Sequence, residues 1–92
     1  MIYERTRRFN KSLDSLPANV QMKVIKAIEL FVDNPRHPSL RVKKMKKHQT
    51  IWEARVDRFY RFTFEQDHDS ETGEAICRFR NVGRHDILDH NP

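Results

Sequence analysis

The apolar residues of this chain change their spacing once, at two prolines, and that change limits which folds the chain can adopt. Before Pro35 the apolar residues recur every three or four positions, which is typical of amphipathic helices. After Pro38 they alternate with polar residues, which is typical of strands with one buried face. The sequence therefore predicts helices first and an antiparallel sheet second, in one α+β domain spanning residues 1–92.

The first part of the chain predicts two helices behind a short strand. Residues 2–4 are short enough for an edge strand, and the apolar spacing of residues 9–16 predicts a short helix. A second, longer helix is expected over residues 20–31, with Pro17 suited to its beginning and Pro35 to its end. We expect the two helices to form an antiparallel pair that packs on one face of the sheet.

The second part predicts three strands, at residues 51–56, 60–65 and 75–82. A tight turn joins the first two strands, and an acidic turn over residues 66–74 joins the last two. If the aromatic residues of these strands face the helices, the charged residues face the other way. That predicted open face carries Glu53, Arg55, Arg61, Arg78 and Arg80.

Positive charge is concentrated in the middle of the chain. Residues 36–61 hold nine basic residues against two acidic ones, a net +7, whereas the whole chain carries +5 and the remainder therefore −2. Four of the basic residues lead into the sheet, at Lys43, Lys44, Lys46 and Lys47. A basic patch next to an arginine surface favours a polyanion as partner, and we expect these lysines, together with Arg78 and Arg80, to contact an RNA backbone.

Other classes of protein are disfavoured by composition. The single cysteine, Cys77, cannot form an internal disulfide, which fits a reducing, cytoplasmic location. No segment is apolar enough for a signal sequence or a membrane span, so no membrane association is expected. No cysteine and histidine spacing is typical of a metal site, so neither a metal nor another cofactor is expected.

The order of several short motifs resembles the RelE/ParE superfamily of bacterial toxins, and within it the RelE-like messenger-RNA nucleases. The motifs are FNKSLDSLP (9–17), Asn34-Pro35, SLRVKKMKK (39–47), IWEARV (51–56), YRFTF (60–64) and VGRHDIL (82–88). The resemblance implies two helices against a four-stranded sheet, in a fold shared with microbial RNases. It also implies metal-free endoribonuclease cleavage of mRNA on the ribosome, and a cognate antitoxin that silences the toxin.

The resemblance also implies roles for particular residues. Arg61 matches the strand arginine that contacts the scissile phosphate, and Glu53 and Arg55 occupy the polar positions of the preceding strand. His85 falls where relatives carry a catalytic arginine or histidine. Many relatives place lysines on the strand of Glu53 and a tyrosine near the C-terminus; this chain has neither, which leaves the general base open.

Metal-free RNA cleavage requires a base, an acid and cations that stabilise the phosphorane. Arg61 and Arg55 are expected to bind the phosphate, because a guanidinium fits two phosphate oxygens. The alternative is that they form surface ion pairs with Glu53 and Glu65. An expected positive excess at Arg78 and Arg80 favours phosphate binding.

Imidazole changes its charge near neutral pH, so His85 is the expected acid or base. Neighbouring arginines keep Glu53 ionised and therefore a weak base, which favours a role in holding an arginine. Two other readings stay open. One is a ParE-like toxin that poisons DNA gyrase, and the other is an RNA-binding module without catalysis. Titratable groups beside the arginines favour the nuclease.

Overall fold

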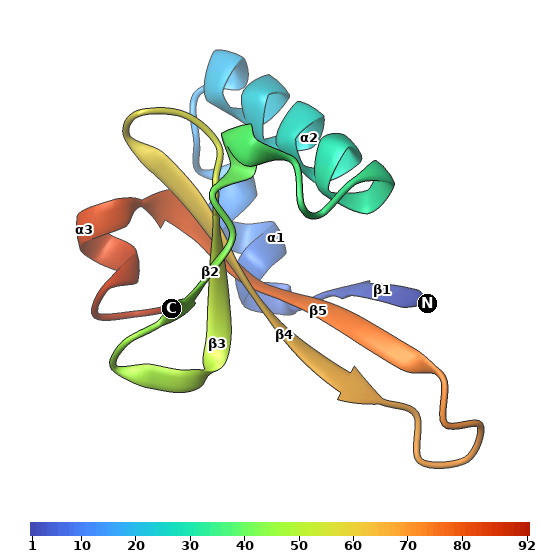
Figure 1. Ribbon diagram of the computed structural model, residues 1–92. Coiled ribbons are helices and arrows are strands. Elements are labelled where there is room, and N and C mark those ends of the chain that lie inside the picture. The colour runs from blue at the N-terminus through green and yellow to red at the C-terminus, as the bar shows by residue number, and fades with distance from the viewer.

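The computed structural model describes all residues, 1–92, as an α+β fold built on one five-stranded sheet (Figure 1). The strands are β1 (Ile2–Arg5), β2 (Lys43–Met45), β3 (His48–Arg55), β4 (Tyr60–His68) and β5 (Ala75–Arg84). The helices are α1 (Arg7–Asp14), α2 (Ala18–Asp33) and α3 (His85–Leu88), with a short 3₁₀ helix at Pro38–Leu40. The predicted fold class is confirmed.

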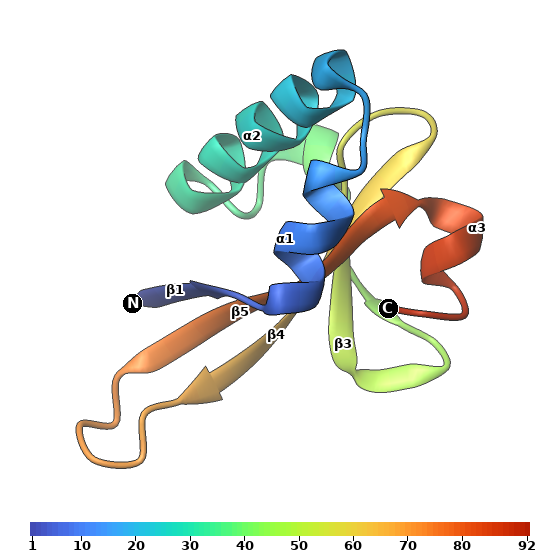
Figure 2. The same cartoon turned by 180° about the vertical axis from the view of Figure 1, so that it is seen from behind.

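The sheet is mostly antiparallel and has the strand order β1-β5-β4-β3-β2. Only β1 runs parallel to its neighbour, β5, which brings the N-terminus beside the third predicted strand. The basic lead-in to the sheet contains β2, a strand that the sequence pattern did not predict, so the sheet has five strands instead of the four that the resemblance implies. The long β4–β5 hairpin projects beyond the rest of the molecule (Figures 1 and 2).

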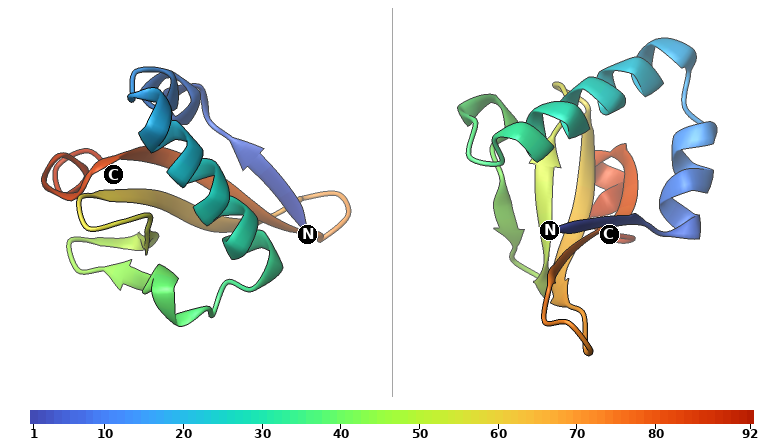
Figure 3. Two further views of the ribbon diagram at one scale, coloured as in Figure 1. Left: turned by 90° about the horizontal axis from the view of Figure 1, so that it is seen from above. Right: turned by 90° about the vertical axis from the view of Figure 1, so that its right-hand side faces the viewer.

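The two N-terminal helices do not form the expected antiparallel pair. Helix α1 lies against β5, and α2 turns away from it and crosses over the sheet (Figure 3). The aromatic side chains explain the difference. Phe9 of α1 packs on Phe79, with ring centroids 5.6 Å apart, and Phe31 of α2 packs on Phe64, at 4.7 Å. The helices therefore spread over the sheet, where each buries its own aromatic ring, instead of packing along one another.

The helix-facing side of the sheet forms the core, as the alternation predicts. Phe62, Phe64 and Phe79 are each at most 2% exposed, and their rings surround that of Phe31. Cys77 is also buried in this layer, and burial raises the pKa of its thiol to about 11. The thiol therefore stays protonated at neutral pH and is not a nucleophile in this fold.

The second face of the sheet is partly covered, although the sequence predicted an open one. Helix α3 and the residues after it fold back over this face, and Leu88 is only 1% exposed. The Thr63 hydroxyl donates a hydrogen bond to the Pro92 carbonyl (2.6 Å), and the Asn81 side-chain amide donates one to the Asn91 carbonyl (2.7 Å). Polar groups in the middle of this face thus bind the C-terminal segment, and only the two ends of the face remain open.

None of the helices is long and apolar enough to cross a membrane.

Candidate functional site

Two arginines stand directly opposite each other where β3 and β4 meet their connecting turn. Arg55 and Arg61 are cross-strand partners, and both donate to the carbonyl oxygen of Asp57. The distances are 3.2 Å from Nε of Arg55 and 2.9 Å from Nη1 of Arg61. The side chains thus converge on one point, as the sequence predicted for these two residues, and we call them the arginine pair.

The arginine pair has no carboxylate partner. The two glutamates that the alternative reading assigned to it are paired elsewhere: Glu53 with Lys43 (3.4 Å), and Glu65 with other arginines. Like charges directly opposite in a sheet are destabilising. The guanidinium groups are held only by backbone carbonyls, the shared one of Asp57 and, for Arg61, also that of Tyr60 (3.2 Å). Two guanidinium groups without a carboxylate partner are a poor structural device and a suitable site for an anion with several oxygens.

Asp57 builds the turn that holds the arginine pair. Its Oδ1 accepts hydrogen bonds from the amides of Phe59 (2.8 Å) and Tyr60 (2.9 Å), while its Oδ2 lies 3.2 Å from the Lys23 ammonium group. Burial alone would raise the pKa of this carboxyl group, but the two amides and Lys23 outweigh it and hold the pKa below its usual value. Asp57 is not among the site residues predicted from the sequence, although an aspartate at the start of a tight turn is a recognisable signal.

His85 lies at the beginning of α3, beside the same turn. Its backbone amide donates to the Phe59 carbonyl (3.1 Å), and its imidazole is exposed and makes no hydrogen bond. Gly83 of β5 precedes His85 by two residues and is the cross-strand partner of Arg61. A Cβ atom at Gly83 would meet no atom within 4 Å, so the space next to Arg61 is open. The His85 backbone is therefore held at the turn that carries the arginine pair.

Glu53 and the lysines lie further along the same face, in a depression of about 340 Å³. We call it the lysine depression; it is lined by residues 43–48, Glu53 and Asp89. Glu53 is two residues from Arg55 on the same face of β3, and its side chain is only 13% exposed. The ammonium group of Lys44 lies over the Trp52 ring, 5.3 Å from its centroid. Lys46 and Lys47 take part in no ion pair, which leaves their charges available to a ligand.

The predicted positive excess at Arg78 and Arg80 is wrong. Arg78 is paired with Glu4 (3.1 Å), Glu65 (3.3 Å) and Asp67 (3.5 Å), and Arg80 with Glu65 (3.2 Å). The hydrogen bonds that Arg78 donates to Glu65 and Glu4 raise its pKa further. The sequence could not show this neutralisation, because Glu4 reaches Arg78 only through the parallel pairing of β1 with β5.

Arg80 also stands apart from the arginine pair. The pairing register of β4 and β5 shifts after Thr63, so that Asn81 and Phe79 have strand partners and Arg80 between them has none. We therefore leave Arg78 and Arg80 out of the candidate site.

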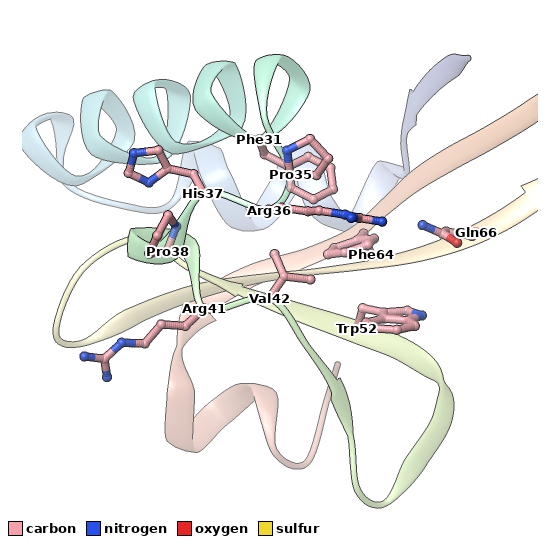
Figure 4. A pocket seen from close by; sticks show the side chains of 10 residues that line it. All are labelled: Phe31, Pro35, Arg36, His37, Pro38, Arg41, Val42, Trp52, Phe64 and Gln66. Atoms are coloured by element: carbon pink, nitrogen blue, oxygen red, sulfur yellow. The ribbon is translucent and has the colours of Figure 1, made fainter.

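A larger depression, of about 630 Å³, lies on the helix side of the sheet and contains none of the predicted site residues. Figure 4 shows Trp52, Phe64 and Val42 near one another in it, with Arg41 directed away from them. Arg41 has a positive φ of 44°, an uncommon conformation for a residue with a side chain. Arg36, His37 and Arg41 also line this depression, but the two arginines that face each other across neighbouring strands lie on the opposite face, so the candidate site is placed there.

The order and packing of these elements define a fold that other proteins share. No protein-family model matches the sequence, and no curated protein sequence matches it significantly. The fold is nevertheless that of the RelE-like toxins of toxin–antitoxin systems. The resemblance seen in the sequence is therefore confirmed for the fold.

Three solved structures illustrate this similarity. YafQ from E. coli strain BL21(DE3) matches with a TM-score of 0.72 at 15% identity, over 94% of each chain. The YoeB/ParE toxin from Agrobacterium tumefaciens matches with a TM-score of 0.70 at 15% identity, over 92% of this chain and 99% of its own. A chain of the RelB–RelE antitoxin–toxin complex from Methanococcus jannaschii matches with a TM-score of 0.63 at 21% identity, over 97% and 99%.

Proposed function

We propose that the protein is the toxin of a toxin–antitoxin system and a metal-independent endoribonuclease that cleaves mRNA on the ribosome. The observation that carries this proposal is the arginine pair, which presents two guanidinium groups without a carboxylate partner at a turn to which the His85 backbone is also hydrogen-bonded. The fold, and the resemblance of the sequence to RelE-like messenger-RNA nucleases, support the same reading.

In this proposal Arg55 and Arg61 bind the scissile phosphate. The 2′-oxygen of the RNA attacks phosphorus, so a P–O2′ bond forms, and the P–O5′ bond breaks to leave a 2′,3′-cyclic phosphate and a 5′-hydroxyl. Negative charge grows on the phosphoryl oxygens during this step. Two fixed guanidinium groups stabilise that charge more in the transition state than in the ground state.

His85 and Glu53 divide the proton transfers. We assign protonation of the departing 5′-oxygen to His85, because its imidazole is exposed and its backbone amide is hydrogen-bonded to the turn that carries the arginine pair. Glu53 is the nearest carboxylate to the arginine pair along β3, and it accepts the 2′-hydroxyl proton once the RNA has displaced Lys43. The lysine depression binds the neighbouring RNA backbone, which adds affinity with little sequence information.

The proposed partner is a cognate antitoxin. Solved structures with this fold include toxins in complex with the antitoxins RelB and DinJ. An antitoxin that covers the arginine pair or the lysine depression would block RNA binding, and the positive charge of both favours an acidic segment.

The test is brief expression in bacteria, with the 5′ ends of messenger RNAs mapped before and after induction. We expect cuts within translated codons, and we expect Arg61→Ala and His85→Ala to lose them. Loss of one phosphate-binding arginine raises the barrier by about 2–4 kcal/mol, which slows cleavage about 30- to 900-fold.

Arg78→Ala is the matched control, because Arg78 lies on the same face but is already paired with three carboxylates. We expect its cleavage rate to stay within about tenfold of the original protein. An Arg61→Ala rate that also stays within tenfold would rule out the assigned phosphate site. Intact messages together with a DNA-damage response would support the ParE-like reading instead.

A further inference from the structure

The exposed ring of Phe59 stands at the tip of the β3–β4 turn. It is 46% exposed, and two guanidinium groups lie over it, with Cζ of Arg58 5.6 Å and Cζ of Arg84 5.3 Å from the ring centroid. We propose that Phe59 is a stacking platform for one unpaired nucleobase of the bound RNA. This inference rests on the proposed function, which supplies the RNA.

The platform is rigid. The Phe59 amide donates to Oδ1 of Asp57 (2.8 Å), and the Phe59 carbonyl accepts from the His85 amide (3.1 Å). Both backbone groups of an exposed residue at the tip of a turn are therefore fixed. The ring loses little conformational freedom on binding a ligand, which is the condition for an efficient recognition residue.

The platform is also close to the proposed phosphate site. Phe59 precedes Arg61 by two residues, and two residues of chain span at most about 7 Å. The carbonyl that positions both guanidinium groups belongs to Asp57, two residues earlier in the same turn. A nucleotide whose phosphate lies on the arginine pair thus places its own base, or an adjacent one, within reach of the ring.

The two arginines over the ring differ in how firmly they are held. Arg58 is exposed and takes part in no ion pair, whereas Nε of Arg84 lies 3.9 Å from Asp86. The base therefore takes the place of Arg58 over the ring, and Arg58 moves to a phosphate. Arg84 stays and contributes a cation–π interaction. Every base has an aromatic face, so this subsite fixes the position of a nucleotide without selecting its identity.

The experiment measures binding of a fluorescein-labelled, unstructured ten-nucleotide RNA whose 2′-O-methyl sugars prevent cleavage. A series of the same RNA lacks one base at each position in turn. For the unaltered protein at low salt, we expect one position at which the missing base weakens binding about 5- to 150-fold. In Phe59→Ala the intact RNA binds more weakly by a similar factor, and the penalty at that position disappears; Phe59→Trp keeps it.

Ile25→Ala is the matched control. It removes an apolar side chain of similar exposure, 48%, from the outer surface of α2, and it should preserve the pattern of the unaltered protein. A Phe59→Ala protein that keeps both the affinity and the position-dependent penalty overturns the stacking platform and leaves the proposed function standing. An unaltered protein that binds no RNA, with or without bases, overturns both.

Discussion

At the scale of single residues, the candidate site depends on one backbone carbonyl. Arg55 and Arg61 would repel each other across the strands, and the Asp57 carbonyl is the one group that both contact. Its position is set by the carboxylate of the same residue, which accepts the amides of Phe59 and Tyr60. In the proposed mechanism Asp57 is therefore a positioning residue, which acts through the arginine pair and not by contact with the RNA.

Replacing Asp57 by alanine tests that role. We expect Asp57→Ala to lower the free energy of unfolding by about 1–2 kcal/mol, because two amides lose their acceptor. We expect cleavage to fall at least tenfold under conditions where the variant is fully folded, because the turn no longer fixes the two guanidinium groups. Unfolding in urea and single-turnover cleavage measure the two effects separately. A folded variant that cleaves at the original rate would show that the turn does not position the arginines.

The same carboxylate makes stability depend on pH in a defined direction. The pKa of Asp57 is lowered in the folded protein, so the unfolded chain takes up the proton first as acid is added. The stabilising contribution of Asp57 is complete above about pH 5 and is lost as the pH falls through the folded-state pKa. Urea unfolding at pH 6 and at pH 3 should therefore show a smaller loss of stability for Asp57→Asn than for the unaltered protein. Equal losses would mean that this carboxylate is not coupled to folding.

At the scale of elements, the spacing of apolar residues predicted the helices and strands, whereas the pairing register of the strands could not be predicted from it. The positions of both N-terminal helices and three strands follow from the apolar spacing, as does the sheet face that carries Arg55 and Arg61. The pairing of Arg78 does not follow, because it depends on a parallel partner strand and on a register shift. The burial of Thr63 depends on a C-terminal segment whose polar residues show no periodicity. Local pattern therefore placed Arg55 and Arg61 on one face of the sheet but overestimated the net positive charge of that face.

Helix α1 and the irregular part of β5 share one side chain, that of Thr6. Its hydroxyl oxygen accepts the Phe9 amide (3.0 Å), which caps α1, and its hydroxyl proton is donated to the Arg80 carbonyl (2.9 Å) where β5 lacks a strand partner. We expect Thr6→Ala to cost about 1–2 kcal/mol in the free energy of unfolding, and Thr6→Ser to recover most of it. Equilibrium unfolding in urea measures both. A Thr6→Ser variant as unstable as Thr6→Ala would show that the methyl group matters and the hydroxyl does not.

At the scale of the whole molecule, charge is separated along the sheet. The projecting β4–β5 hairpin carries acidic residues that neutralise Arg78 and the N-terminal amine, while the arginine pair lies at the other end of β4 and the lysine depression lies on the β2 edge of the sheet. A polyanion is therefore attracted to these two sites and repelled by the hairpin, which orients it before contact. The net charge of +5 understates the local charge at the site.

The lysine depression should control how strongly salt weakens RNA binding. Lys43 is paired with Glu53 and Lys44 lies over Trp52, so Lys46 and Lys47 are the lysines left to neutralise phosphates. Each phosphate contact to single-stranded RNA contributes a slope of about −0.7 to a plot of log affinity against log salt concentration. Replacing both Lys46 and Lys47 by alanine should therefore reduce the slope by about 1.4. Replacing two exposed basic residues of α1, Arg7 and Lys11, by alanine should leave it unchanged. Equal slopes for the two double variants would mean that RNA is attracted by the net charge of the protein and not by this depression.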